Sequence, residues 1–388
     1  MMKGITKTVW VLSFVSLLTD MASEMLYPVM PLFLKHIGYS VILIGFVEGV
    51  AEAVAGLTKG YFGRRSDQMG SRLPFVRAGY TLSAISKPML AWFVSPWWIF
   101  VSRSLDRLGK GMRSGARDGL LGDESNTNTR AQVFGFHRSM DTFGAVLGPA
   151  IALIYLYYNP NDYKTLFLIA FLPGLLAVLL TFAIKEKERL GQPLAGFKAG
   201  VFTFASYWRR SPGAYKKITR GFLVFALFNS SDVFLLLRIK EAGFSDTYVI
   251  AIYIFYNLVF ALLAYPLGLL ADKVGLKKMY ISGLIIYALV YIGFGFTNNL
   301  YAFLALFALY GVYAAATEGI AKAWISNVVD PREIATAIGS YSGYQSIAAL
   351  VASSLCGLLW FTIGATGTFL VTASVAIMVT IYLSQTRV

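Results

Sequence analysis

The chain has 388 residues, of which 57% are hydrophobic and only 14% are charged, and its mean hydropathy is +0.62. So few charged residues cannot cover the surface of a soluble protein of this length, which excludes that class and indicates several membrane-spanning helices. The net charge of +14 comes with no aromatic-interleaved basic module, so nucleic-acid binding is not expected. One cysteine and two histidines exclude an internal disulfide and leave little material for a metal site; neither a metal nor another cofactor is expected.

Twelve stretches are long and apolar enough to cross a bilayer, which takes about 20 helical residues. In chain order they are 8–34, 40–62, 74–95, 97–118, 131–157, 165–185, 218–240, 247–271, 278–297, 299–325, 333–359 and 364–384. No small-residue cleavage site follows the first stretch, so we expect it to remain in the mature protein. Basic residues concentrate in alternate connections, and the positive-inside rule then places both termini in the cytoplasm.

The first predicted span carries two carboxylates in an otherwise apolar helix. Asp20 and Glu24 lie one turn apart on a single face, and Tyr27 follows them. At 1.5 Å per residue, Asp20 lies roughly 18 Å into the membrane, near its midplane. Two poorly solvated carboxylates this close repel each other, so one of them takes up a proton readily. We expect this pair to carry protons. The alternative is that basic partners neutralise both groups, which then only fix helix packing.

A charged hairpin follows the second span and returns after the eighth. Asp67 lies in the first copy and Asp272 in the second, 205 positions further on. Gly38-Tyr39-Ser40 and Gly243-Phe244-Ser245 are separated by the same interval. The chain is therefore expected to be a duplicated bundle of membrane helices, the architecture of transporters.

The duplication predicts three regions: an N-terminal six-helix domain at 1–185, a cytoplasmic linker at 186–217 and a C-terminal six-helix domain at 218–388. The linker is the longest polar stretch of the chain. Its basic, aromatic part at 197–208 is either an amphipathic helix on the membrane surface or a plain tether.

The fourth span carries five basic and two acidic side chains. At 100° per residue, six of them fall within about 120° and form a polar stripe that faces the protein interior rather than lipid. The stripe consists of Arg103, Asp106, Arg107, Lys110, Arg117 and Asp118. These basic side chains are candidate partners for Asp20 and Glu24. Arg113, Arg117 and Asp118 approach the cytoplasmic end, where a gating role is expected.

The fifth span has small residues at helical spacing, which allow close contact with a facing helix, and a proline that kinks it. These residues are Gly135, Gly144, Gly148 and Pro149. Asp141 lies between them, and its role is either functional or structural. Glu48 on the second span is a candidate ion-pair partner for Lys87 on the third.

The second half of the chain is poorer in buried charge and richer in polar aromatic residues. A substrate-binding surface is expected from both halves. It comprises Tyr27, Arg103, Asp106, Asn229, Asp232, Tyr256, Glu318, Lys322, Tyr341 and Gln345.

The doubled hairpin Gly-x-x-x-Asp-x-x-Gly-x-[Arg/Lys] resembles the loop signature of the major facilitator superfamily, and the resemblance covers essentially the whole chain. It implies an all-α membrane protein of twelve helices in two pseudo-symmetric six-helix bundles, working by alternating access. The expected gate residues are Gly63, Asp67, Arg72, Arg117, Gly268, Asp272 and Lys278. The first copy departs from the pattern, because Gln68 follows the aspartate where the family usually has a basic residue.

Two further signatures concern coupling. Arg107-x-x-Lys110-Gly111 resembles the helix-4 signature, whose arginine is implicated in proton coupling, although Lys110 replaces the usual glutamine. The helix-5 glycines resemble the motif of the exporter and antiporter branches, although Ala152-Leu153 replaces its final glycine pair. With the carboxylates of the first span, this resemblance gives an expected proton-coupling set of Asp20, Glu24, Arg107 and Lys110, in which Asp20 or Glu24 exchanges between Arg107 or Lys110 and a proton.

The leading functional hypothesis is proton-coupled export of small amphipathic organic compounds. The alternative is proton-coupled uptake of an organic anion or a metal chelate, suggested by the positive excess on the fourth span. A transport-dead receptor is a third reading. No nucleophile–base arrangement or P-loop indicates an enzyme. We expect a monomer in a bacterial inner membrane, with a eukaryotic organelle as the alternative, and a small molecule, protons and the lipid bilayer as partners.

Overall fold

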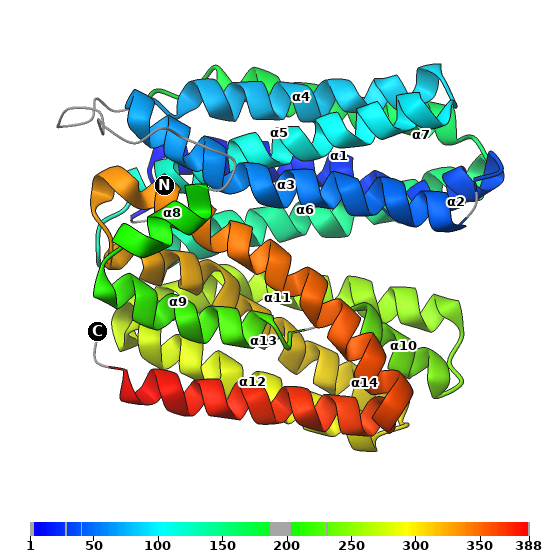
Figure 1. The fold of residues 1–388 in the computed structure, drawn as a ribbon. Coiled ribbons are helices and arrows are strands. Elements are labelled where there is room, and N and C mark those ends of the chain that lie inside the picture. Colours follow the sequence, from blue (N-terminus) through cyan, green and yellow to red (C-terminus); the bar gives the residue numbers. More distant parts are fainter. Residues whose placement is uncertain (1–3, 28, 40, 187–202, 230–231, 387–388) are drawn as a thin grey trace. The chain divides into compact units, whose positions relative to one another are not determined.

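The computed structural model describes residues 4–27, 29–39, 41–186, 203–229 and 232–386, and these are helical apart from short connections (Figure 1). The helices, in order, are α1 (Lys7–Leu26), α2 (Met30–His36), α3 (Val41–Met69), α4 (Leu73–Trp92), α5 (Pro96–Asp123), α6 (Arg130–Tyr158), α7 (Tyr163–Thr181), α8 (Thr203–Arg210), α9 (Gly213–Ala226), α10 (Val233–Glu241), α11 (Asp246–Val274), α12 (Leu276–Phe296), α13 (Leu300–Asn327), the 3₁₀ turn η1 (Pro331–Glu333) and α14 (Ile334–Gln385). The expected all-α fold class is confirmed.

Helix ends coincide with capping residues in the sequence. Ser95 caps α5 and is followed by Pro96, whose missing N–H costs nothing at the first helical position. Asn299 and Asp162 cap α13 and α7 through their side-chain oxygens. Local side-chain chemistry therefore accounts for where these helices begin.

Two predicted spans are each divided into two helices. The first, 8–34, becomes α1 and α2, and the seventh, 218–240, becomes α9 and α10. The last two predicted spans, 333–359 and 364–384, both fall within α14, which is broken into two helices at the non-helical Gly364, whose φ is 75°. Interrupted helices at corresponding positions of two halves are typical of substrate-binding regions in transporters.

By length and apolar composition, seven helices in the described part of the chain are able to cross a membrane: α1, α6, α7, most of α11, α12, α13 and α14. Helix α5 spans 28 residues but carries the charged stripe, so composition alone does not identify it.

The chain divides into two compact units, each containing a short segment from the other half of the sequence. Unit 1 comprises residues 1–124, 140–209 and 330–343, and unit 2 comprises 125–139, 210–329 and 344–388. The domain boundaries expected at 185 and 218 remain a prediction. The linker residues 187–202, including part of the segment 197–208, lie outside the described residues, whereas Thr203–Arg210 is helical.

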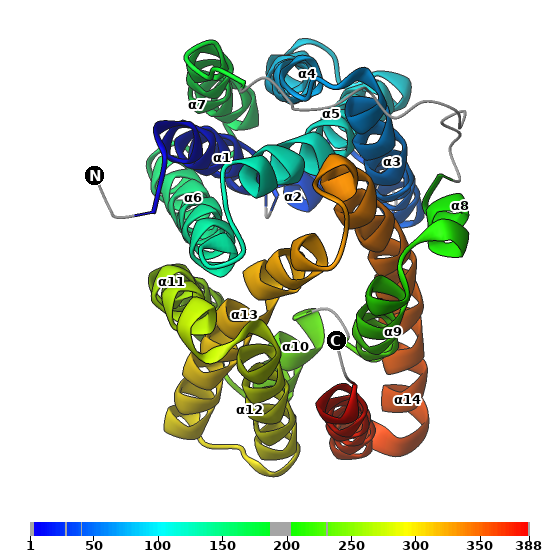
Figure 2. The same ribbon diagram turned by 90° about the vertical axis from the view of Figure 1, so that its left-hand side faces the viewer.

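In unit 1, α4 packs on α5 and α7, α3 on α5, and α1 on α7, all running alongside one another (Figure 1). In unit 2, α13 packs between α11 and α12, as the end-on view shows (Figure 2). Glycines permit the closest approaches. Gly144 and Gly148 of α6 touch the backbone of α1, and a Cβ placed on Gly148 would lie 2.5 Å from the Met21 carbonyl oxygen.

We expect Gly148→Ala to destabilise the protein by about 1–3 kcal/mol, because the added methyl group meets backbone that cannot turn away. Gly357→Ala is the matched control, since its Cβ would have no neighbour nearer than 3.9 Å. Thermal unfolding of the purified protein in detergent measures both. Equal melting temperatures for the two variants would show that the α1–α6 contact is not tight.

Candidate functional site

The hairpin between α3 and α4 is anchored by a buried carboxylate. Asp67 is 2% exposed and accepts hydrogen bonds from the backbone N–H and the hydroxyl of Thr336, both at 2.7 Å. It also accepts one from Arg72 Nη2 at 3.0 Å. Thr336 lies in the first turn of α14, so Asp67 satisfies a helix N–H that has no partner within its own helix. A Cβ on Gly63 would lie 2.5 Å from the Ala335 carbonyl oxygen, so the glycine permits this approach.

The same hairpin gathers further charged groups. Arg72 Nη1 lies 3.0 Å from Asp123, and Glu186 accepts hydrogen bonds from the backbone N–H groups of Arg72 and Leu73 at 2.7 and 3.2 Å. Glu186 thereby caps α4. Hydrogen bonds from Arg332 hold the pKa of Asp330, which precedes α14, below its usual value.

The second hairpin repeats this arrangement inside unit 2. Asp272 accepts hydrogen bonds from the backbone N–H groups of Ala131 and Gln132, at 3.0 and 2.7 Å, in the first turn of α6. A side chain at Gly268 would collide with the Ala131 carbonyl. Ala131 and Thr336 are 205 positions apart, the same interval as the two aspartates. Of the expected gate residues, Lys278 is exposed at the start of α12.

Each hairpin aspartate is expected to protect the amides of the helix that it caps. Asp67→Ala removes the acceptor for Thr336 and should raise hydrogen exchange in the first turn of α14 about fivefold, since an N-cap contributes roughly 1 kcal/mol. Asp272→Ala should do the same at Ala131 and Gln132 only. Peptide-resolved exchange measures both, and each variant is the control for the other. Protection unchanged from the wild type, or protection lost at both helices in both variants, would contradict the proposal that each aspartate caps one helix.

A buried ion pair joins α4 and α5. Lys87 Nζ lies 2.8 Å from Asp106 Oδ1, and the Ser83 hydroxyl donates to the same oxygen at 2.5 Å. Lys87 also donates to the Ser23 hydroxyl of α1 at 3.2 Å. The structure thus places Asp106, an expected substrate-binding residue, in a fully buried pair. The expected partner of Lys87, Glu48, has a side chain outside the described residues.

Arg103 lies beside this pair. It is 5% exposed and, with Ser86 and Ser102, helps to line a polar pocket of about 10 Å³, room for a single water molecule. Arg103 and Asp106 are therefore brought together, in a space too small for an organic substrate.

Asp141 of α6 is held firmly in unit 1. It accepts a hydrogen bond of 2.5 Å from the Ser16 hydroxyl of α1, and Arg117 Nη1 lies 3.8 Å from its carboxylate. Arg117 also donates to Ser16 at 3.0 Å and pairs with Asp118 at 3.1 Å. The expected gate residue Arg117 therefore belongs to a buried cluster that connects α1, α5 and α6, and Asp141 has a structural partner.

Asp20 is held much more loosely. Its carboxylate lies 3.9 Å from Arg113 Nη2, beyond hydrogen-bond distance, and its side chain is 24% exposed. Arg113 is buried and stacks over the Tyr80 ring at 4.7 Å. The sequence pattern placed Arg113 towards a gate and missed this proximity. The available signal was its position one turn after Lys110 on the same helix.

The other expected coupling residues lie along the same helices. Glu24 is half-buried one turn after Asp20, Arg107 is 8% exposed and Lys110 is half-buried. Tyr27, at the end of α1, is 54% exposed. Their assignment to proton coupling and substrate binding remains a prediction.

Unit 2 gathers three expected substrate-binding residues around a group of tyrosines. Tyr310 donates to Asp232 at 2.7 Å, and its ring centroid lies 5.0 Å from that of Tyr256. Asn229 accepts from Tyr287 at 3.1 Å and donates to Tyr313 at 3.3 Å. Asn229 and Asp232 lie in the connection between α9 and α10. The tyrosine cluster, defined as Tyr256, Tyr287, Tyr310 and Tyr313, is therefore a buried group of packed rings, with the Asp232 carboxylate hydrogen-bonded to one of them.

The remaining expected substrate residues are distributed elsewhere. Glu318 forms an ion pair of 2.5 Å with Arg138 of α6, which also lies over the Phe260 ring at 5.1 Å. Lys322 is half-buried one turn further along α13. Tyr341 is buried, and Gln345, one turn further along α14, is exposed. Within the described residues no group of three or more metal-ligating side chains is found.

Two helical units with interrupted helices and charged groups buried inside them define a multi-pass membrane transporter. The chain belongs to the Major Facilitator Superfamily, whose family model matches residues 12–255 and again 221–387. The resemblance inferred from the hairpins is confirmed.

Two curated relatives and one solved structure show the range of similar proteins. An "uncharacterized MFS-type transporter" of Methanocaldococcus jannaschii is 32% identical over 92% of this chain and 89% of its own. The "multidrug resistance protein MdtH" of Proteus mirabilis is 21% identical over 81% of this chain and 76% of its own. The crystal structure of the Escherichia coli fucose:proton symporter FucP has a TM-score of 0.81 at 12% identity, with both chains fully covered. The last likeness shows the fold alone.

Removal of Lys87 tests the buried pair. Lys87→Ala leaves the Asp106 carboxylate buried without its cation and should cost about 3–5 kcal/mol of stability, whereas Lys87→Met combined with Asp106→Leu should cost much less. Thermal unfolding in detergent compares the two. A double variant as unstable as the single one would show that the pair does not act as a unit.

Proposed function

We propose that the protein exports small amphipathic organic compounds in exchange for protons, by alternating access. The observation that carries the proposal is the contrast between two carboxylates on neighbouring helices. Asp141 is fixed by Ser16 and Arg117, whereas Asp20 has a loose contact with Arg113 and is partly exposed. A carboxylate that exchanges protons must reach water and have a partner from which it can separate.

The coupling step involves one proton. When Asp20 is charged, the attraction of Arg113 holds α1 near α5. When an oxygen of Asp20 takes up a proton, that attraction is lost, and Arg113 keeps its contact with the Tyr80 ring. Loss of the proton on the other side of the membrane restores the pair. The protonation state of Asp20 therefore decides whether α1 is held near α5.

The contact between α1 and α6 supports transmission of that change. A Cβ on Gly144 would collide with the Leu17 carbonyl and would lie 3.1 Å from the Asp20 Cβ. Because no side chain separates the backbones of α1 and α6 here, the two helices shift together. A shift of α1 is therefore passed to α6.

The tyrosine cluster supports an amphipathic substrate. Aromatic faces stack on flat compounds and attract cations, and Asp232 supplies a negative charge at the edge. The partial likeness to the multidrug resistance protein MdtH is in keeping with this substrate class.

A second candidate is proton-coupled uptake of an organic anion or a metal chelate. It is favoured by the five basic side chains of α5 against its acidic ones, since Arg103, Arg107 and Arg113 are all buried in unit 1. For either candidate we propose a monomer in a bacterial inner membrane with both termini in the cytoplasm, as the basic connections suggest.

Proteoliposomes test the proposal. With a pH-sensitive dye inside and an imposed gradient, addition of a cationic amphiphile should release protons in the wild type, and Asp20→Asn should abolish this movement. Glu241→Gln is the control, because it removes one exposed carboxylate at the end of α10. Proton movement retained in Asp20→Asn would refute the coupling role, and movement triggered only by anions would favour the second candidate.

A further inference from the structure

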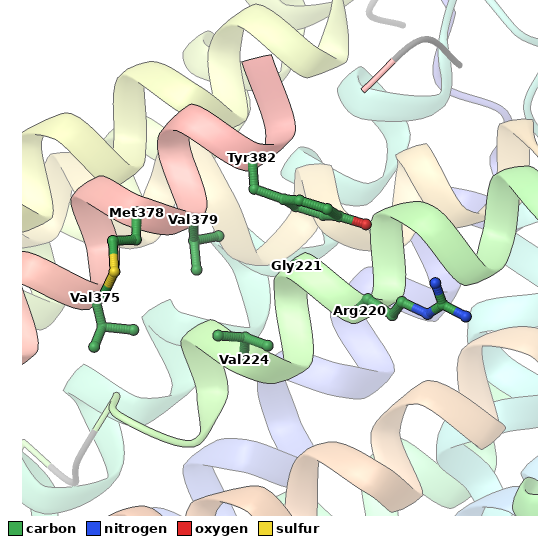
Figure 3. Close-up of a pocket in the computed structure, with 7 residues that line it drawn as sticks. All are labelled: Arg220, Gly221, Val224, Val375, Met378, Val379 and Tyr382. Atoms are coloured by element: carbon green, nitrogen blue, oxygen red, sulfur yellow. The ribbon is translucent and has the colours of Figure 1, made fainter. Parts of the chain in front are cut away.

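A groove of about 440 Å³ runs between α9 and the last part of α14, within unit 2 (Figure 3). Its lining consists of Arg220, Gly221, Val224, Val375, Met378, Val379 and Tyr382. None of these residues is part of the tyrosine cluster or of the charged groups described above.

The groove is apolar along its length. Val375 and Val379 are 6% and 3% exposed and form its floor, whereas Val224 and Met378 are 45% and 59% exposed at its edges. Gly221 permits α9 to approach the end of α14, because a Cβ there would lie 2.8 Å from Leu383 Cδ2. In a membrane protein, an open apolar surface on spanning helices contacts lipid acyl chains.

One end of the groove is polar. The Tyr382 hydroxyl donates to the Lys217 carbonyl oxygen at 3.0 Å, and the exposed Arg220 extends its guanidinium beyond the apolar lining at that end (Figure 3). Lys216 and Lys217 precede Arg220 on the same helix. Tyrosine and basic residues are typical of the level where acyl chains meet headgroups.

We propose that this groove binds an anionic phospholipid, with one acyl chain against the valines and the phosphate against Arg220. Val375 lies two turns from Tyr382, about 10 Å along the helix, which accommodates part of an acyl chain. The concentration of basic residues at this end assigns it to the cytoplasmic leaflet, whose surface is negative. The charge of Arg220 therefore selects an anionic headgroup, and the apolar groove accommodates the acyl chain.

Native mass spectrometry of the purified protein in detergent tests the site directly. Phosphatidylglycerol and phosphatidylcholine with identical acyl chains are titrated separately, and phosphatidylglycerol should bind about fivefold more tightly, as expected for one basic side chain near an anionic headgroup. Added salt should reduce this preference.

Two variants measure separately what the headgroup and the acyl chain contribute to binding. Arg220→Gln should remove the preference for phosphatidylglycerol, and Val224→Trp, which fills the groove from its edge, should weaken binding of both lipids. Lys273→Gln is the control, because it removes the same charge from an exposed position at the end of α11.

Three results would overturn the proposal: equal binding of the two lipids to the wild type, an unchanged preference in Arg220→Gln, or competition by free glycerol phosphate as strong as by the lipid. Melting temperatures equal to the wild type show that the variants are folded. The binding measurement involves no transport, so it is independent of the proposed export function.

Discussion

The cost of placing a charge in hydrocarbon governs the rest of this structure. An ionisable group in a membrane-spanning helix must be paired or must face a polar interior. Helix α5 carries eight ionisable side chains, and three of its buried ones meet that requirement in pairs: Asp106 pairs with Lys87, and Arg117 pairs with Asp118. Glycines such as Gly79 and Gly109 then permit α4 and α5 to approach closely enough for such pairs to form. Charge pairing therefore depends on close helix packing, and Asp20 is paired less closely than Asp106 or Asp141.

In both halves of the sequence, a carboxylate accepts hydrogen bonds from the N–H groups at the start of a helix. Asp67 caps α14 and Asp272 caps α6, and in each case the capped helix comes from the other half of the sequence. The glycines that follow, Gly70 and Gly275, both have positive φ, of 67° and 99°, which turns the chain back into the next helix. Each unit therefore contains a short segment of the opposite half, held by hydrogen bonds from a carboxylate to the start of a helix.

In the proposed mechanism, stability and function draw on different contacts within unit 1 and unit 2. The ion pair of Lys87 with Asp106 and the cluster around Asp141 are short, buried and multiply bonded, which suits a scaffold. The contact of Asp20 with Arg113 is long and partly exposed, and the helix interruptions beside Tyr27 and Asp232 leave polar groups near ends of helices. Long, partly exposed contacts cost less free energy to break, so they are the ones that a proton or a substrate is able to change. The lipid site proposed beside Arg220 would add a third environment to unit 2, the headgroup region of the bilayer.

The sequence by itself determined the all-α membrane fold, the duplication at an interval of 205 residues and the family, because apolar span length and repeated motifs are local properties of the chain. It also located Asp20, Asp232 and both hairpin aspartates as charges that require partners. Only the tertiary structure decided which partners they have: Arg113 rather than a residue nearer the middle of α5, Tyr310, and the first turns of α14 and α6. The division of the first and seventh spans was likewise missed, since their apolar composition continues across the interruptions. The physical reason is that a partner depends on the rotation and depth of two packed helices. These are set by contacts between residues from 78 to 269 positions apart, which no local pattern encodes.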